Sequence, residues 1–422
     1  MRPFEWLFFA GLLVIDFPPL RVFRYFLFSD LLFLLSYFLL FLQSGRMPWP
    51  LSPPMLYVTL TLYSLSALLS LFRAPHPEDA FSTLVHLMFL TFIYVPLVSA
   101  LLRTSPRLFS LTFVGFIVIT IVRDIDIILL PLAGVEWQYG TRLSGLSQAQ
   151  TLYVMLPGTM ALCLLALQEW PRKKERHLSR PSLFSRQWPL LFPLSGIILS
   201  AIAFMITRFR SIWIASFCSL LLLSVQLRRR RVIRALTYPI VTAVALMFLI
   251  WNGFLPQAVI DRFSSSFDPQ APDIIARREV VWRLLPIVSE NPFLGIGFNN
   301  SKCFLPLELV EGRVDAIHNL LLSNLVENGL LALLALAALP PLLWSFYRQV
   351  HRKGDARERY LGTWGISSCL GIYLGAQLTP NMLEHTFWFL IAYLTGLVAS
   401  TTSHDQWEEN RNGLMEVSKN GS

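Results

Sequence analysis

The sequence predicts an all-α integral membrane protein with about twelve transmembrane helices and one larger polar loop on the outer side of the membrane. Hydrophobic residues make up 54% of the 422 residues and charged residues only 14%, and the mean hydropathy is +0.54. Soluble domains contain about 25% charged residues, so this chain is too apolar to be one of them. Its apolar runs are also close to the length of about 20 residues that a helix needs to cross the hydrocarbon core.

The apolar runs follow one another along most of the chain. We expect spanning helices at 4–17, 26–42, 55–72, 81–102, 109–130, 151–167, 189–206, 212–227, 238–254, 318–346, 360–377 and 387–400. Glu5 and the lack of a small-x-small cleavage site indicate that the first run is a retained span and not a cleaved signal. Residues 1–401 are therefore expected to form a transmembrane domain that includes a polar loop at 255–317. The polar tail 402–422 is expected to be disordered.

Clusters of basic residues predict the orientation of the chain. They lie at 172–176, 228–234 and 348–359, and each of these segments follows an even-numbered span. Cytoplasmic loops carry an excess of Lys and Arg, so both termini and these segments are expected in the cytoplasm. The other loops, including 255–317, then face the outer side. Because the basic residues behind the net charge of +9 lie in such short clusters, we do not expect nucleic acid as a partner.

The cysteines predict neither a disulfide framework nor a metal site. Cys163, Cys218 and Cys369 lie inside apolar runs and Cys303 stands alone in a loop, with no CxxC pair. No cluster of His, Cys, Asp and Glu has the spacing of metal ligands, so we expect no metal and no other cofactor.

The long outer loop contains a predicted amphipathic helix, PDIIARREVVWRLLPIVSENP. Four apolar residues recur on it at helical spacing, namely Ile274, Val281, Leu285 and Val288. The Asn291-Pro292 pair ends the helix, which we expect to lie along the membrane surface. The stretch FLGIGFNN follows, where Gly295 and Gly297 permit tight backbone turns.

Two pairs of arginines are candidate anion-binding residues. Arg208 and Arg210 stand in TRFRSIWIA, a short break between two expected spans on the outer side. A structural role explains one arginine there, because its guanidinium can reach the membrane interface. Two arginines in such a tight turn favour an anion-binding site as much as that structural role. Arg277 and Arg278 lie on the surface helix, and Arg278 shares a face with Trp282. Lipid headgroup binding or a cation–π contact would explain that pair too. Arginine suits phosphate because its planar fork makes paired, charge-assisted hydrogen bonds.

The His318-Asn319 pair stands where the polar loop meets the apolar run 318–346, which places a titratable ring at the outer membrane surface. An unperturbed imidazole has a pKa of about 6.5, so it can accept or donate a proton at neutral pH. A histidine at an interface can also be purely structural. Glu327 is about 13 Å further along the helix, too far to orient His318 directly, so we expect it to be structural. Arg142, in TRLSGLSQAQ before the sixth span, is a weaker candidate on the same side.

Four stretches within residues 142–340 together resemble the O-antigen ligase and O-antigen polymerase superfamily, bacterial membrane glycosyltransferases that use lipid-linked sugar donors. TRLSGLSQAQ is similar to the family's Arg-x-x-Gly segment. RFRSIWIAS resembles its Ser-Arg-Gly-type turn at Arg210, although Phe209 replaces the usual small or hydroxyl residue. RREVVWRLLPIVSENPFLGIGFNN resembles the Arg-x-x-x-Trp helix followed by Pro-x-x-Gly-x-Gly, and HNLLLSNLVENGLLALL resembles the His-Asn segment followed by Glu-x-Gly. The helix stretch matches that pattern at Arg278, Trp282, Pro292, Gly295 and Gly297.

The resemblance implies a GT-C-like fold and an inverting, metal-independent glycosyl transfer at the periplasmic face of a Gram-negative inner membrane. The donor would be an O-antigen carried on undecaprenyl pyrophosphate. Arg210 and Arg278 match family arginines that bind the pyrophosphate, and His318 matches the histidine that takes part in catalysis. Possible secondary site residues are Arg208, Arg277, Arg142, Trp282 and Asn319.

Within this superfamily we favour a ligase, which transfers polymerised O-antigen to the lipid A–core oligosaccharide of lipopolysaccharide. Polymerases often carry two sizeable outer loops, whereas here one loop dominates. A polymerase, with another lipid-linked glycan as acceptor, is the main alternative. A lipid or sugar transporter would place polar sites on broken helices near the bilayer midplane, whereas these arginines and His318 gather at one face. Membrane lipids are the remaining expected partner.

Overall fold

The structure is a computed structural model that describes residues 2–15, 27–45, 54–132, 272–305, 319–377 and 385–401, with single positions at 199, 218, 219, 222, 270 and 317. The secondary structure in these ranges is helical, and they contain no β-strand. The predicted all-α architecture is confirmed for the part of the chain that the structure describes.

The first part of the chain forms six helices. They are α1 (Pro3–Leu13), α2 (Phe28–Ser44), α3 (Pro54–Ser70), α4 (Pro77–Phe89), α5 (Val95–Thr104) and α6 (Pro106–Leu132). A 3₁₀ turn, η2 (Leu71–Arg73), ends α3, and a π-helical stretch, η3 (Leu90–Tyr94), joins α4 and α5 into one helix of 28 residues. Proline is the first residue of α1, α3, α4 and α6, where its missing N–H costs no helical hydrogen bond.

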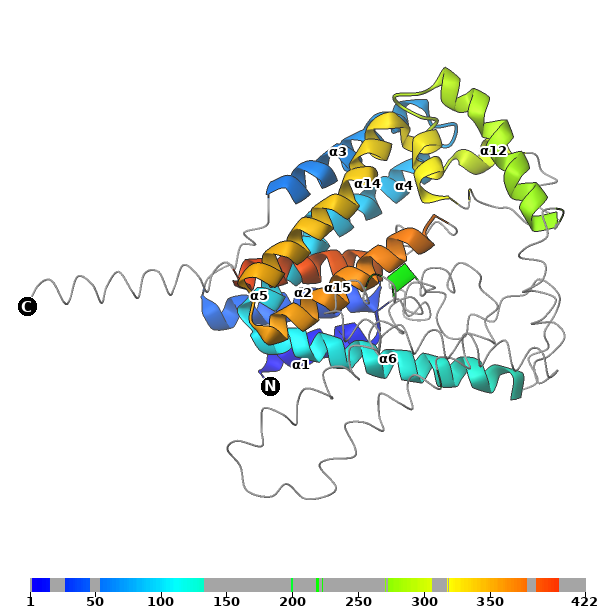
Figure 1. The fold of residues 1–422 in the computed structure, drawn as a ribbon. Helices are drawn as coiled ribbons and strands as arrows, with labels where there is room; N and C mark the ends of the chain where they lie inside the picture. Colours follow the sequence, from blue (N-terminus) through cyan, green and yellow to red (C-terminus); the bar gives the residue numbers. More distant parts are fainter. Residues whose placement is uncertain are drawn as a thin grey trace, which may run out of the picture.

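The second part contributes one surface helix, one short turn and three helices of the bundle. They are α12 (Pro272–Glu290), η4 (Ser301–Phe304), α14 (Leu320–Lys353), α15 (Ala356–Gly375) and a final apolar helix, His385–Thr401. Figure 1 shows α1, α2, α5, α6 and α15 gathered in one bundle, with α3, α4 and α14 extending from it towards α12. The turn from α14 to α15 is fixed by a cap, because the Asp355 carboxylate accepts the N–H of Glu358 at 2.7 Å.

Helices lie at each of the eight expected spans that fall within the described residues. By length and composition, four can cross a membrane: Pro54–Arg73, Pro77–Thr104, Arg107–Asp126 and Leu320–Lys353. They expose large apolar side chains such as Val58, Val85 and Leu334, as lipid-facing helices do. The chain is therefore a multi-pass membrane protein. The four expected spans between 151 and 254 lie outside the described residues apart from isolated positions, so the full number stays a prediction.

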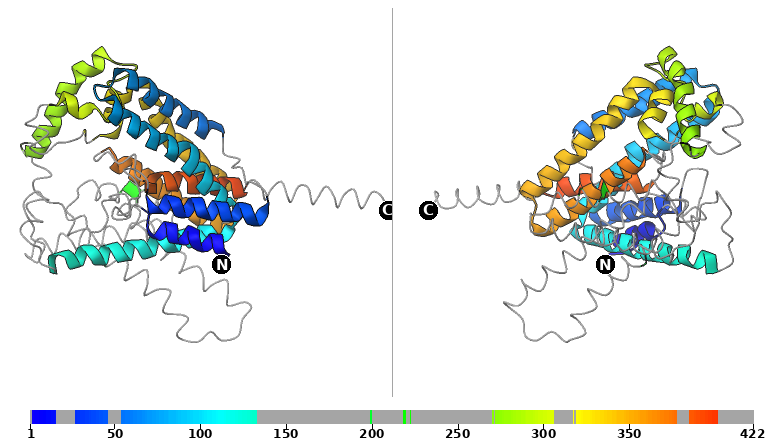
Figure 2. Two further views of the ribbon diagram at one scale, coloured as in Figure 1. Left: turned by 180° about the vertical axis from the view of Figure 1, so that it is seen from behind. Right: turned by 45° about the vertical axis from the view of Figure 1, so that its right-hand side comes forward.

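Aromatic side chains fill the centre of the bundle. Trp364 of α15 packs against Phe116 of α6 and Tyr393 of the final helix, with ring centroids 5.7 and 5.1 Å away. Phe389 lies 5.9 Å from Phe33 of α2, so the final helix connects opposite sides of the core. Every residue from 385 to 399 is buried, and the views in Figure 2 show this helix enclosed by its neighbours.

The bundle also encloses a buried carboxylate–imidazole pair. Oδ2 of Asp30, in the first turn of α2, lies 3.1 Å from Nε2 of His385, the first residue of the final helix. The same carboxylate accepts the N–H of Leu27 at 2.9 Å and so caps α2. A buried carboxylate is costly unless it is paired and hydrogen-bonded, and both conditions hold here.

The two ends of α14 have different surroundings: its start contacts the end of α15, and its other end is basic. At its start, the N–H of Leu320 donates to the carbonyl of Ala376 at the end of α15, at 3.1 Å. At its other end, the basic segment 348–359 covers the end of α14, the turn that follows and the start of α15. The residues expected on the outer side and those expected in the cytoplasm are thus separated by the length of α14.

Candidate functional site

The structure describes four of the eight candidate site residues. Arg277, Arg278 and Trp282 lie on α12, and Asn319 precedes α14. The other four lie outside the described residues: His318, Arg210, Arg208 and Arg142. The geometry below therefore concerns the two elements to which Arg278 and His318 are attached.

The predicted surface helix is present as α12, and one of its faces packs on the protein. Val280 and Leu284 are buried against Ile296, Leu305, Ile317 and Val326. Val281 and Leu285, two of the four apolar residues that predicted the helix, are 38% and 44% exposed. α12 thus carries apolar residues on two adjacent faces, and spacing alone does not show which of them meets α14.

The exposed face of α12 combines one cation with apolar side chains. Val281 and Trp282 lie three and four residues after Arg278, and Leu285 lies four and three residues after them, so the four share this face. Trp282 is 67% exposed, and no described residue pairs with the Arg278 guanidinium. On the neighbouring turn, Arg283 instead pairs with Glu279 at 2.6 Å. A face of this kind suits the boundary between headgroups and acyl chains, where apolar groups enter the lipid and a cation meets phosphate.

Asn319 is the N-cap of α14. It has extended φ and ψ angles, and its side-chain oxygen accepts the N–H of Leu322 at 2.8 Å. This is the usual use of Asn before a helix, because the first N–H groups have no partner within the helix. The cap fixes the point at which the chain leaves residue 318 and enters the helix.

The loop 291–301, which we name the motif loop, joins α12 to the start of η4 and packs on α14. Its backbone pairs with that of α14: the N–H of Ile296 donates to the carbonyl of Val326 at 3.0 Å, and that of Gly297 to the carbonyl of Glu327 at 2.9 Å. Gly295 and Gly297 have φ of 67° and 103°, angles that favour glycine. A Cβ on Gly295 would also lie 2.4 Å from the carbonyl of Glu327. The Gly-x-Gly pattern therefore serves a close backbone contact.

Glu327 completes this contact with its side chain. Its Oε2 accepts the N–H of Asn299 at 3.0 Å, and its Oε1 accepts the hydroxyl of Ser301 at 2.5 Å and the N–H of Ser301 at 3.4 Å. The carboxylate is buried, with only 6% of the residue exposed. The sequence predicted a structural glutamate here, but it did not show that the partners are backbone amides of a distant loop.

Gly329 breaks α14, which the sequence had predicted to be continuous over 318–346. Its φ of 79° and ψ of −173° are not helical, so the chain bends between residues 328 and 330. The N–H of Leu330 donates instead to the carbonyl of Pro292 at 2.8 Å. A Cβ at Gly329 would lie 2.1 Å from the carbonyl oxygen of Phe293. The Glu-x-Gly and Pro-x-x-Gly-x-Gly patterns thus describe the two sides of one contact.

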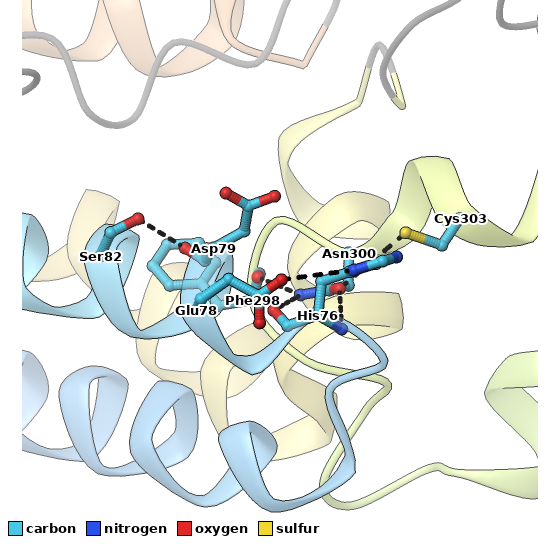
Figure 3. A network of polar contacts seen from close by, with 7 residues as sticks. All are labelled: His76, Glu78, Asp79, Ser82, Phe298, Asn300 and Cys303. Carbon is cyan, nitrogen blue, oxygen red and sulfur yellow. Dashed lines mark hydrogen bonds and ion pairs between the residues drawn. The ribbon is translucent and has the colours of Figure 1, made fainter.

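The motif loop is also attached to the corner between α3 and α4. Figure 3 shows Asn300 facing His76: its Oδ1 accepts the N–H of His76 at 3.0 Å, and its Nδ2 donates to the carbonyl of Phe298 at 2.9 Å. The guanidinium of Arg73 donates to Asn291 at the other end of the loop. Sequence reasoning missed Asn300 and His76, because neither lies in a recognisable spacing with the other.

The described part of the site joins α12 to the start of α14 through the motif loop. The motif loop holds α12, with Arg278, against the start of α14, which follows His318. An exposed guanidinium beside Trp282 is suited to bind a phosphate at a lipid surface. Within the described ranges, no three His, Cys, Asp or Glu side chains are placed to hold a metal ion.

Comparison with known proteins shows which family part of the chain is similar to. Residues 195–337 match the family model described as O-antigen ligase. No curated protein matches the chain. The matched segment contains Arg208, Arg210, Arg278 and His318 together with the whole motif loop, whereas Arg142 precedes it. The resemblance that the sequence motifs indicate is therefore confirmed: residues 195–337 of this multi-pass membrane protein are similar to the O-antigen ligase family.

Proposed function

We propose that the protein is an O-antigen ligase, which transfers polymerised O-antigen from undecaprenyl pyrophosphate to the lipid A–core oligosaccharide of lipopolysaccharide. The family match implies a ligase-like or polymerase-like glycosyltransferase. The observation that carries the proposal further is the exposed face of α12, where Arg278 stands beside Val281 and Trp282 on a helix fixed to the start of α14. A donor made of a lipid, two phosphates and a glycan presents the complementary groups.

The arginines have the role of stabilising the leaving group. Transfer breaks the bond between the anomeric carbon of the glycan and a pyrophosphate oxygen, so negative charge develops on that oxygen. In this proposal Arg278 and Arg210 bind the pyrophosphate, and no metal is required. Arg208, Arg277 and Arg142 are secondary candidates for the same charge, and Trp282 lies beside the lipid of the donor.

His318 has the role of handling the acceptor hydroxyl. In an inverting transfer the hydroxyl oxygen forms the new bond to the anomeric carbon from the face opposite the leaving group. Its proton must then leave, and a neutral imidazole can accept it or orient the hydroxyl. Help from a general base contributes typically about 10²–10⁴-fold, so loss of His318 is expected to be severe.

The location follows from the expected orientation. We place the protein in the inner membrane of a Gram-negative bacterium, with about twelve spans, both termini in the cytoplasm and the site facing the periplasm. The structure around the break in α14 makes a transporter the less favoured alternative. The motif loop's own backbone fills that break, as the hydrogen bond between Leu330 and Pro292 shows, and leaves no room for a substrate at Gly329.

The proposal is tested by deleting the gene in its native host and analysing both lipopolysaccharide and lipid-linked glycans. A ligase predicts full-length glycan accumulating on the undecaprenyl carrier and bare core on the cell surface. Core that carries a single repeat unit would show a polymerase instead. Unchanged lipopolysaccharide would contradict both activities and would favour the transporter alternative.

A further inference from the structure

The first part of α14 is a short helix of its own, which we name the tip helix. Gly329 breaks α14, so residues 320–328 form a segment that is separate from 330–353. These nine residues span about 13 Å at 1.5 Å per residue. His318 and Asn319 directly precede the segment, so the proposed catalytic residue is attached to its outer end.

Glu327 lies at the opposite, inner end of the tip helix, beside the break. Its carboxylate accepts two backbone N–H groups and one hydroxyl from Asn299 and Ser301 of the motif loop. Because a carboxylate has two acceptor oxygens and no proton to donate, it can satisfy all of these donors together. The contact therefore depends on the charge and shape of this side chain as well as on backbone pairing.

The motif loop is in turn continuous with α12. The N–H of Asn291 donates to the carbonyl of Ile287 at 3.0 Å, and the N–H of Gly295 to the carbonyl of Asn291 at 3.1 Å. Val280 and Leu284 of α12 also pack on Val326 of the tip helix and Ile296 of the loop. A movement of the loop would therefore move α12, and with it Arg278.

Because the helix is broken at Gly329, a small tilt of the tip helix there would displace its outer end appreciably. A tilt of about 10° at the inner end would displace the outer end of a 13 Å segment by about 2 Å. Misplacement of a catalytic group by about 1 Å can cost about 10²-fold in rate. Hydrogen bonds at the break are well placed to prevent such a tilt.

We propose that Glu327 is a positioning residue, which fixes the angle between the tip helix and α12 and so sets the position of His318 relative to Arg278. The inference rests on the proposed function for the roles of His318 and Arg278. Glu327 itself touches neither the donor nor the acceptor. Its effect on the reaction passes through Asn299 and Ser301 of the motif loop.

The test compares Glu327→Ala and Glu327→Gln with Glu358→Gln in the full-length protein in lipid nanodiscs. Gln keeps the size of the side chain, but it has only one acceptor oxygen. Its NH₂ group would then face an N–H or O–H group of the motif loop, which is also a donor. Glu358 is a matched control, because its carboxylate also accepts a backbone N–H, from Asp355 at 2.9 Å, but at the far end of α14. Hydrogen exchange of peptides covering 292–305 and 319–330 is measured together with kcat and both KM values.

We expect exchange in both peptides to be about tenfold faster in Glu327→Ala, with a smaller increase in Glu327→Gln and no change in Glu358→Gln. The kcat per folded enzyme should fall about 10²-fold in Glu327→Ala, with KM values nearly unchanged. If the alanine variant does not accumulate, Glu327→Gln and Ser301→Ala give the same comparison with a smaller expected loss.

Two results would overturn the positioning role. Unchanged exchange in these peptides would show that Glu327 does not hold the loop. Faster exchange with an unchanged kcat would show that the contact only stabilises the fold. Absence of transfer by the wild-type protein would instead contradict the proposed function, and the exchange data would still show whether the carboxylate holds the tip helix.

Discussion

Gly45 and Gly329 both have a positive φ, but their surroundings differ. At Gly45, which ends α2, a Cβ would meet nothing within 4 Å, whereas at Gly329 it would lie 2.1 Å from the carbonyl oxygen of Phe293. The angles differ too. Gly45 is in the left-handed helical region, whereas Gly329 combines a φ of 79° with a ψ of −173°. The second combination is essentially restricted to glycine.

We therefore expect Gly329→Ala to be far more destabilising than Gly45→Ala. The Gly45 variant should cost about 1 kcal/mol, the strain of a left-handed alanine. The Gly329 variant adds displacement of the motif loop and should cost at least about 3 kcal/mol. Thermal unfolding of both variants in the same detergent measures the difference. Equal losses would show that the contact between the motif loop and Gly329 is not made.

The sequence predicted some roles of single residues and not others. A structural role was expected for Glu327, since a carboxylate inside an apolar run needs a partner, whereas the N-cap role of Asn319 was not predicted. Which partner Glu327 has depends on the path of a loop that lies 26 to 28 residues earlier in the chain, and that path is a tertiary property. Local spacing carries no information on such a contact.

At the scale of elements, α12 shows that periodicity can identify a helix without showing which of its apolar residues pack on the protein. Leu284 is fully buried, whereas its neighbour Leu285 is 44% exposed. Both are leucines in the same turn, so only their surroundings distinguish them. This pair offers a matched test of the packing.

Leu284→Ala should destabilise the packing of α12, and Leu285→Ala should not. Truncating a fully buried leucine costs about 2–5 kcal/mol, because a cavity remains. Truncating Leu285 removes apolar area only from the proposed lipid-facing surface, so we expect a higher KM for the lipid-linked donor with nearly unchanged stability. Thermal unfolding and donor titration measure the two effects. If Leu285→Ala were the more destabilising variant, the packed face described above would be incorrect.

At the scale of the whole molecule, length and hydropathy predicted the membrane class, and the helices lie where apolar runs were expected. The break at Gly329 was not predicted, because a single glycine inside an apolar run is also tolerated in a straight helix. For Arg210 and His318 the proposed proximity stays a prediction, since both lie outside the described residues.

Cys303 offers a test of the proposed orientation. Its side chain is exposed on η4, directly after the motif loop, whereas Cys369 is buried in α15. With the site facing the periplasm, a membrane-impermeant maleimide should label Cys303 in cells whose outer membrane alone is permeabilised. Loss of the label in Cys303→Ser identifies the site. Labelling that requires disruption of the inner membrane would place the loop on the cytoplasmic side.

The central claim is that Arg278 binds the pyrophosphate of a lipid-linked glycan that is transferred to the lipid A–core. The most direct measurement is transfer by the purified protein, with undecaprenyl pyrophosphate-linked O-antigen and core lipopolysaccharide, in the presence of a chelator. We expect transfer by the wild-type protein and by Arg283→Ala, whose arginine pairs with Glu279 on the same helix. Arg278→Ala should lose at least about 10²-fold in rate, the usual effect of removing a group that stabilises transition-state charge. Transfer by Arg278→Ala at the wild-type rate would contradict the account.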